Sequence, residues 1–222
     1  MKLLVCWALS AALVAGSAGA ATALPEALQN ELDRAVVAYE SGRLTTARAA
    51  FESLARRQVP AAQYNLATMH LRGEVPKPDL ALAQWLLTRA AEGGFVTAQF
   101  MLGQAWENGN FGRRDLALAH RWYEVAASSG SVDAAVAMGT ARYLGRGLAK
   151  DTAEAARWFR EAAKGGDVGA QYLLAAMYEQ GDGVERDLRL ARYWYDIAAK
   201  NGDVAAPGKL KEVEALMAAQ PS

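Results

Sequence analysis

Apolar residues in this chain recur every three to four positions, and the stripes that they form recur in turn along the sequence. Near the C-terminal end, Ala170, Leu174 and Tyr178 mark one such stripe. Spacing of this kind places side chains on one face of an α-helix. A glycine-rich break follows, and a second stretch with the same periodicity comes after it. The segment therefore predicts two antiparallel helices, at about 168–180 and 187–200.

Landmark residues repeat this helix pair with a step of 36 residues. The residues that keep the step are Ala62, Ala98, Ala134 and Ala170; Gly73, Gly109, Gly145 and Gly181; Asp79, Asp115, Asp151 and Asp187; and Gly94, Gly130, Gly166 and Gly202. Self-similarity at 20–50 residues is typical of a solenoid. We expect the aspartates to cap the second helix of each pair and the glycines to end the helices. The sequence thus predicts four units, 60–95, 96–131, 132–167 and 168–203.

The repeated pattern resembles the Sel1-like repeat, a relative of the tetratricopeptide repeat. In the fourth unit it is carried by Ala170, Leu174, Met177, Tyr178, Gly181, Gly183, Val184, Asp187, Ala191, Trp194, Ala198, Ala199 and Gly202. The resemblance covers about 60–203. It implies an all-α fold, a right-handed α-solenoid of antiparallel helix pairs, and an adaptor or scaffold role.

The other units depart from this pattern at a few positions. Val75 and Phe111 replace the second glycine in the first two units, so we expect those turns to differ in shape. The position of Tyr178 is held by His70, Trp106 and Arg142 in the earlier units. In the third unit Asp151 is followed three residues later by Glu154, which predicts a capping box.

The regions outside the four units have their own predicted roles. Residues 1–20 have the basic start, apolar run and small-residue end of a secretory signal, with cleavage near Ala20 or Ala23. The alternative is an uncleaved membrane anchor, although the apolar run is shorter than the roughly 20 residues of a span. Residues 25–57 read as a divergent helix pair and 204–222 as a capping helix. We therefore expect an exported bacterial member of the family, periplasmic or secreted.

Composition narrows the classes of function. The chain has 24 basic and 24 acidic residues, and this balance argues against a nucleic-acid or anionic-membrane surface. Its one cysteine, Cys6, lies in the predicted signal, so the mature chain would lack thiol chemistry. The polar outer side of the last helix disfavours end-to-end stacking, so we expect a monomer with no membrane contact after cleavage.

No catalytic or metal-binding pattern is apparent. His70 and His120 are the only histidines, and they lie in different units without a partner at metal-ligand spacing. The recurrent aspartates are explained by capping. We therefore expect no enzymatic activity, cofactor or metal.

The family resemblance implies that the first helix of each unit lines the concave side of the array. The positions expected to face that groove are Asn65, Thr68, Arg72, Met101, Gln104, Asn108, Thr140, Leu173 and Gln180. This surface is mixed polar and apolar and lacks strong charge. It suits a protein or peptide partner in the cell envelope better than a phosphate or a metal.

Aromatic residues offer an alternative. Trp122, Trp158 and Trp194 keep the step of 36 and are expected in the core, whereas Trp85, Trp106 and Tyr143 fall out of register. Off-register rings are better candidates for exposure. Exposed Trp85, Trp106 and Phe111 would suit stacking on sugars, in an accessory protein of envelope polysaccharide or peptidoglycan handling.

Overall fold

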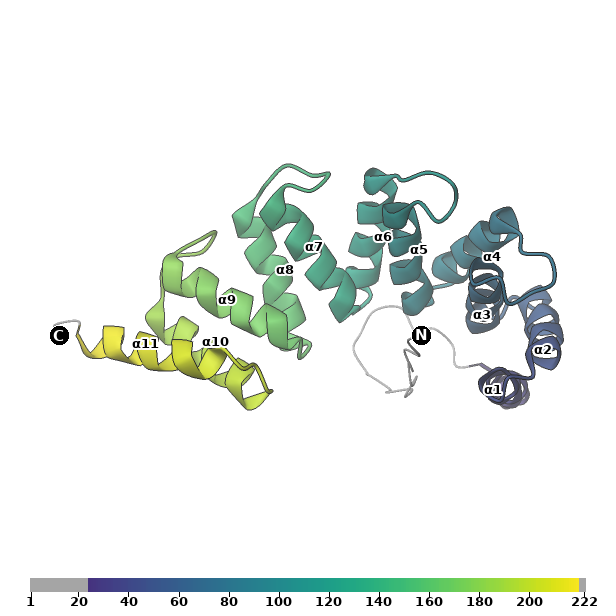
Figure 1. Ribbon diagram of the computed structural model, residues 1–222, viewed down its shortest axis with the longest axis horizontal. Coiled ribbons are helices and arrows are strands. Elements are labelled where there is room, and N and C mark those ends of the chain that lie inside the picture. The colour runs from purple at the N-terminus through teal and green to yellow at the C-terminus, as the bar shows by residue number, and fades with distance from the viewer. Residues whose placement is uncertain (1–23, 220–222) are drawn as a thin grey trace.

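A computed structural model describes residues 24–219, and the predicted signal lies outside them. Within these residues the chain forms helices and no strands (Figure 1). They are α1 (Glu26–Glu40), α2 (Leu44–Arg56), α3 (Pro60–Leu71), α4 (Leu80–Glu92), α5 (Val96–Asn108), α6 (Leu116–Ser128), α7 (Val132–Leu144), α8 (Thr152–Lys164), α9 (Val168–Gln180), α10 (Leu188–Lys200) and α11 (Ala206–Ala218).

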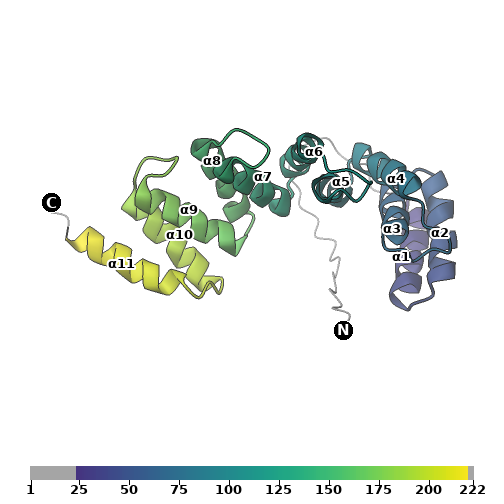
Figure 2. The ribbon, with the colours of Figure 1, turned by 45° about the horizontal axis from the view of Figure 1, so that its top comes forward.

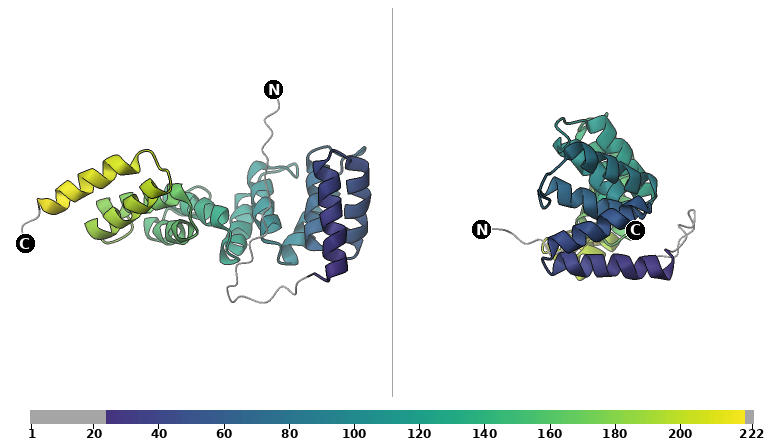
Figure 3. Two further views of the ribbon diagram at one scale, coloured as in Figure 1. Left: turned by 90° about the horizontal axis from the view of Figure 1, so that it is seen from below. Right: turned by 90° about the vertical axis from the view of Figure 1, so that its right-hand side faces the viewer.

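The helices pack mainly on their neighbours in sequence, from α1 against α2 to α10 against α11. They follow one another along an arch (Figure 1), and the other views show an elongated molecule (Figures 2 and 3). Contact restricted to sequence neighbours defines a solenoid. The predicted all-α solenoid of helix pairs is confirmed. We call α3, α5, α7 and α9 the A helices, and α4, α6, α8 and α10 the B helices.

Aspartate and glycine set the helix ends as the sequence predicts. Each B helix begins after an aspartate whose Oδ1 accepts a backbone N–H, for example from Leu82 to Asp79 at 2.9 Å and from Leu118 to Asp115 at 3.0 Å. These bonds satisfy donors that have no partner within the helix. The predicted capping box at Asp151 forms only in half. Asp151 accepts from the Glu154 N–H, but the Glu154 carboxylate contacts Arg142 at 2.9 Å instead.

The A–B turns differ between units, as the replaced glycines predict. Gly147 and Gly183 have positive φ angles of 72° and 70°, whereas Val75 and Phe111 do not adopt such angles. At Gly183 a Cβ would come within 2.2 Å of the Thr152 carbonyl oxygen, so only glycine fits there. The A–B loop of the fourth unit therefore packs directly on the start of α8.

A histidine substitutes for a backbone carbonyl in the first unit. In the third and fourth units the N–H of Asp151 donates to the Arg142 carbonyl at 2.9 Å, and that of Asp187 to the Tyr178 carbonyl at 3.0 Å. In the first unit the N–H of Asp79 donates to His70 Nδ1 at 3.1 Å. His70 is therefore a buried structural residue, which accounts for its place in the tyrosine position of the repeat.

The core runs along the array as two clusters that meet at α7. Ala134 and Met138 belong to the N-terminal cluster and Ala135 to the C-terminal one, so α7 contributes to both. Trp158 packs against both clusters. Among residues 24–219, none of the helices combines the length and the continuous apolarity needed to cross a bilayer.

Candidate functional site

The second unit joins its two helices by a glutamate–tyrosine pair. The hydroxyl of buried Tyr123 on α6 donates to Glu107 on α5 at 2.6 Å, and Arg146 of the next unit contacts the same carboxylate at 3.0 Å. Burial and the hydrogen bond to the Glu107 carboxylate raise the pKa of Tyr123. The hydroxyl therefore stays protonated, and it holds α5 to α6 at this edge of the unit.

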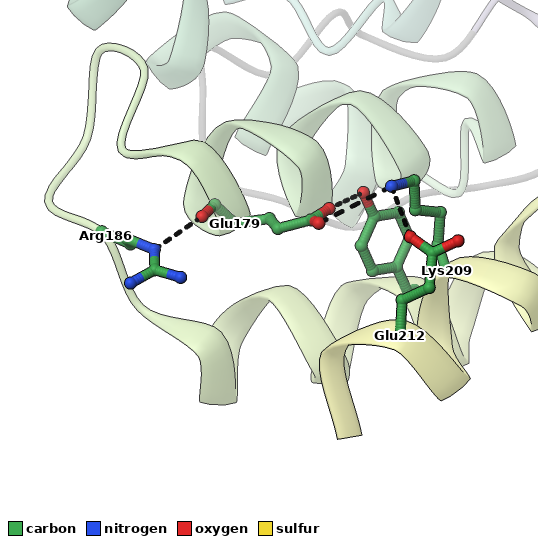
Figure 4. A network of polar contacts seen from close by, with 5 residues as sticks. Glu179, Arg186, Lys209 and Glu212 are labelled. Atoms are coloured by element: carbon green, nitrogen blue, oxygen red, sulfur yellow. Dashed lines mark hydrogen bonds and ion pairs between the residues drawn. The ribbon is translucent and has the colours of Figure 1, made fainter. Parts of the chain in front are cut away.

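The fourth unit repeats the pair 72 residues later. The Tyr195 hydroxyl on α10 donates to Glu179 on α9 at 2.7 Å. Lys209 of α11 lies 3.6 Å from Glu179 and 2.7 Å from Glu212 (Figure 4). Arg186 Nε donates to the Glu179 carbonyl at 2.9 Å, which ties the A–B loop to the helix end (Figure 4). Tyrosine and cation together fill the space beside the glutamate.

The third unit lacks this pair. The equivalent positions are Tyr143 on α7 and Phe159 on α8, so neither a carboxylate nor a hydroxyl can form the bond. On α7 the glutamate is displaced by a shift of one residue, because Arg142 occupies the position of Tyr178 and the tyrosine follows it. Tyr143 lines the same pocket as Asp182 of the fourth unit's A–B loop, and interaction with that carboxylate raises the pKa of Tyr143.

A pocket of about 190 Å³ opens where the pair is missing. It is lined by Thr140, Tyr143 and Leu144 from α7; Phe159 from α8; Leu173, Ala176, Met177 and Gln180 from α9; and Asp182 from the following loop. Phe159 and Met177 are buried, whereas the side chains of Leu144 and Leu173 are 63% and 43% exposed. The pocket therefore has an apolar floor, two exposed leucines in its walls and polar groups at its rim. It lies on what we call the A-helix face, the side of the A helices that points away from the B helices.

The size and lining of this pocket limit what it can hold. Cofactor and drug-sized ligand sites usually occupy roughly 300–1,000 Å³, which is more than this pocket offers. Within residues 24–219, no group of three or more His, Cys, Asp or Glu side chains could hold a metal ion. The pocket suits one large apolar side chain, with Thr140 and Gln180 available to hydrogen-bond to a main chain beside it.

A second cavity, of about 270 Å³, lies between α1 and α2. Its lining is mainly small or charged, including Ala35, Ala38, Ala50, Glu31 and Arg34. It contains no large exposed apolar side chain and none of the residues that the sequence predicts for partner binding. The pocket between α7 and α9 is therefore the stronger candidate.

Three predicted partner-binding residues, Thr140, Leu173 and Gln180, come together in the pocket between α7 and α9. Met101 is half-buried and accepts a contact from the Thr68 hydroxyl at 3.7 Å. Gln104 and Asn108 are exposed on α5. The face is thus apolar toward its C-terminal half and polar toward its N-terminal half.

The remaining predicted residues use their polar atoms within the fold. Asn65 donates to the Ala61 carbonyl at 2.8 Å, and Arg72 donates to the Tyr39 hydroxyl at 3.0 Å. Thr68 is buried and donates to its own helix, so its predicted place on an open surface is wrong. A threonine in a helix can bond back one turn, and here the neighbouring A helix covers it as well.

The predicted set of exposed aromatics does not form. Trp85 on α4 is 57% exposed, but Trp106 is buried and its predicted exposure is wrong. Phe111 from the A–B loop packs edge-on against Trp106 at 5.3 Å, and the Arg113 guanidinium lies 5.8 Å from the same ring centroid. The loop that replaces glycine with Phe111 thus covers Trp106. The three rings offer no shared platform for a sugar.

The sequence did not assign six of the lining residues to a site, namely Tyr143, Leu144, Phe159, Ala176, Met177 and Asp182. Tyr143 stood out as an off-register aromatic but was not assigned to a site. Leu144, Phe159 and Asp182 carried no signal in isolation, because they line the pocket only through the packing of three elements.

Comparison with known protein families identifies the same four units. The model of the Sel1 repeat matches residues 60–95, 96–131, 132–167 and 168–203. This chain belongs to the Sel1 repeat family. Sel1 repeat proteins are generally non-catalytic scaffolds that bind protein partners.

Two solved structures of similar proteins extend the comparison. The crystal structure of a protective antigen from uropathogenic Escherichia coli, which displays an SLR fold, is 29% identical with a TM-score of 0.78; the match covers 86% of this chain and 42% of the antigen. That of a Sel1 repeat protein from Oxalobacter formigenes is 30% identical with a TM-score of 0.74, over 81% and 74% of the two chains. This Sel1 repeat chain thus spans less than half the length of the antigen. A comparison with curated proteins finds no match.

Proposed function

We propose that this Sel1 repeat protein is a non-enzymatic scaffold of the bacterial cell envelope that binds a segment of a partner protein along its A-helix face. The observation that carries this proposal is the pocket between α7 and α9, with its apolar floor and exposed leucines. Exposed apolar side chains that gather at one place mark interaction sites, whereas singly scattered ones are common on any surface. Repeat arrays use extended faces of this kind to hold extended ligands.

The distribution of polarity along the face supports a protein segment as the ligand. Binding energy in protein interfaces concentrates at a few anchors in well-packed pockets, with a polar surround. Leu144 and Leu173 supply such an anchor point in the third and fourth units. Gln104 and Asn108 supply exposed amides that can bond to a main chain farther along the face.

The proposed location, periplasmic or secreted, rests on the signal-like pattern of residues 1–20. Fractionation of cells that express the tagged chain, followed by N-terminal sequencing of the recovered protein, tests it. Recovery of an intact N-terminus from the cytosolic fraction would refute export. That outcome would leave the binding proposal standing.

The binding proposal is tested by crosslinking in cells and affinity capture of a tagged chain, with paired variants. Leu173→Ser changes the pocket, and Leu190→Ser removes a similarly exposed leucine from α10, away from it. We expect a partner protein to be captured with the wild type and with Leu190→Ser, and to be reduced about tenfold with Leu173→Ser. Equal capture by all three folded proteins would refute binding at this part of the face.

A third variant extends the test to the polar half of the face. Asn65, Gln104 and Asn108 are changed together to alanine. If the partner also lies along α3 and α5, capture should fall by a smaller factor than with Leu173→Ser. Light scattering of the purified protein and of its complex gives the stoichiometry and tests the expected monomer.

A further inference from the structure

The rim of the pocket between α7 and α9 carries a charge whose role the fold does not explain. We infer that the pocket recognises a short signature in the partner segment, namely a leucine-sized aliphatic side chain next to a lysine or arginine. This inference rests on the proposed function and specifies its ligand. The aliphatic side chain occupies the pocket, and the neighbouring cation pairs with Asp182.

The aliphatic half of the signature follows from volume and lining. A space of about 190 Å³ admits one branched aliphatic side chain but is small for a cofactor. Phe159 and Met177 form the apolar floor, and methionine adapts to irregular shapes because its side chain is unbranched and flexible. Enclosure between Leu144 and Leu173 would remove a leucine side chain from water and also cover both exposed leucines.

The basic half follows from the position of Asp182 in the repeat. The equivalent residues of the earlier units are Glu74, Asn110 and Arg146. Two of them have internal partners, since Glu74 accepts the Tyr39 hydroxyl at 2.8 Å and Arg146 contacts Glu107 at 3.0 Å. Asp182 forms no ion pair within 4.0 Å among residues 24–219.

At the pocket Asp182 lies beside a neutral group. Its carboxylate faces the Tyr143 hydroxyl, whose raised pKa keeps that group protonated. Lys150 lies over the Tyr143 ring, with Nζ 5.6 Å from the ring centroid, and it is not within 4.0 Å of Asp182. A carboxylate beside an apolar pocket attracts a cation, and an acidic residue in the partner would be repelled.

Two polar side chains at the rim can bind the main chain of the partner segment between its aliphatic and its basic residue. Thr140 on α7 and Gln180 on α9 line the pocket from opposite walls. Their side chains offer donors and acceptors to a peptide group passing over the opening. A segment that bends over the opening can therefore place its aliphatic side chain inward while the long, flexible side chain of the next residue reaches Asp182.

The experiment is a titration of the purified, ¹⁵N-labelled protein with capped hexapeptides, followed by NMR. The parent peptide is acetyl-Gly-Ser-Leu-Lys-Ser-Gly-amide, and its relatives carry serine for leucine or glutamate for lysine. We expect the parent to shift resonances of α7, α9 and the loop at Asp182. The serine peptide should bind about tenfold more weakly, and the glutamate peptide about fivefold more weakly.

Two matched variants distinguish recognition of the peptide's charge by Asp182 from a general effect of acidic residues in this loop. Asp182→Asn removes the carboxylate at the pocket, and Glu185→Gln removes an exposed one from the same loop. Asp182→Asn should abolish the preference for lysine over glutamate without changing the requirement for leucine. Glu185→Gln should leave both preferences intact. A lysine preference that survives in Asp182→Asn would overturn the assignment.

Other outcomes also decide the matter. Shifts confined to α3 and α5 would overturn the pocket assignment but leave partner binding on the A-helix face intact. Concentration-dependent broadening of α7 and α9 resonances without peptide would assign the pocket to a second copy of the chain and refute the signature. If the captured partner needs the polar half alone, the proposed function survives and this inference fails.

Discussion

Among the positions at which the third and fourth units differ, one pair distinguishes an edge closed by a hydrogen bond from an edge that borders a pocket. In the fourth unit, Glu179 and Tyr195 join the A and B helices through a hydrogen bond of 2.7 Å. In the third, Tyr143 and Phe159 stand at the same positions and border a pocket of about 190 Å³. The A and B helices have 13 residues in both units, so the backbone is conserved while the surface changes.

This comparison shows how a repeat array acquires a distinct position along its length. The alanine and glycine positions maintain the packing of successive helix pairs. The pair of positions at the edge of each unit varies along the array, with glutamate and tyrosine in the second and fourth units and tyrosine and phenylalanine in the third. There the third unit has Tyr143 and Phe159 instead of a glutamate and a tyrosine, and an apolar pocket takes the place of the hydrogen bond.

Removal of the aromatic ring at the equivalent positions Tyr195 and Phe159 should have the largest effect on stability. Tyr195 and Phe159 are both buried, so Tyr195→Ala and Phe159→Ala each leave a cavity. We expect Tyr195→Ala to lower the free energy of unfolding by about 3–5 kcal/mol, with Phe159→Ala at the lower end of that range because no hydrogen bond is lost. Urea denaturation followed by circular dichroism measures both. A larger loss for Phe159→Ala would contradict the ranking.

A smaller loss of stability is expected from a substitution that pushes the floor of the pocket into the cavity. Gly139 on α7 packs under the Phe159 ring, and a Cβ at this position would come within 2.8 Å of it. Gly139→Ala should push the ring toward the pocket and lower the free energy of unfolding by about 1–3 kcal/mol. Peptide binding should weaken in parallel. The control is Gly169→Ala in α9, where a Cβ meets only Asp167 Oδ1 at 3.4 Å; equal stability of the two variants would refute this packing argument.

The hydrogen bond between Tyr195 and Glu179, which we call the clasp of the fourth unit, should contribute less to stability than the Tyr195 ring. Tyr195→Phe makes the fourth unit resemble the third and should cost about 1–2 kcal/mol, because Glu179 keeps only its contact with Lys209. Burial and the bond to Glu179 raise the pKa of Tyr195 above its ordinary value of 10.0. Stability due to the neutral hydroxyl is therefore complete below pH 10 and falls as the pH rises above it.

Measurement of unfolding between pH 8 and pH 11 tests this sign. The wild type should lose stability over that interval more steeply than Tyr195→Phe. The matched variant Tyr123→Phe, in the second unit, should likewise lose stability less steeply than the wild type. Parallel curves for wild type and both variants would show that the clasps do not govern the alkaline limit.

The smallest expected effect concerns the junction of the second and third units. Burial lowers the pKa of His120 below its ordinary value of 6.5, opposed by the charge of Glu107 and reinforced by Arg142 and Arg146. The fold favours the neutral imidazole, so stability is complete above pH 6.5 and falls as the pH drops below it. In His120→Gln, the decrease in melting temperature from pH 7 to pH 5 should be about 2 °C smaller. An unchanged decrease would exclude His120 as a source of acid sensitivity.

Sequence periodicity predicts most of the fold and only part of the site. Asp187 and Gly181 mark helix ends through local backbone chemistry, which a single sequence shows directly. Thr140, Leu173 and Gln180 were predicted because the family resemblance implies which face of the first helices is free. The exposure of Trp106 could not be judged, since it depends on how the neighbouring loop folds Phe111 over the ring. Asp182 belongs to the pocket only because residues of α7, α8, α9 and the following loop come together there, and no local pattern encodes that arrangement.

The constant length of the units has a consequence at the level of the gene. Each unit is a cassette of 36 codons, and the residue after every junction begins an A helix. Excision of the third cassette would join Ser131 to Val168, which takes the place of Val132 without a change in chemistry. Such an edit removes Tyr143 and Phe159 together and brings two clasped units into contact. Duplication and loss of cassettes can therefore relocate or erase a binding position while every remaining helix keeps its partner.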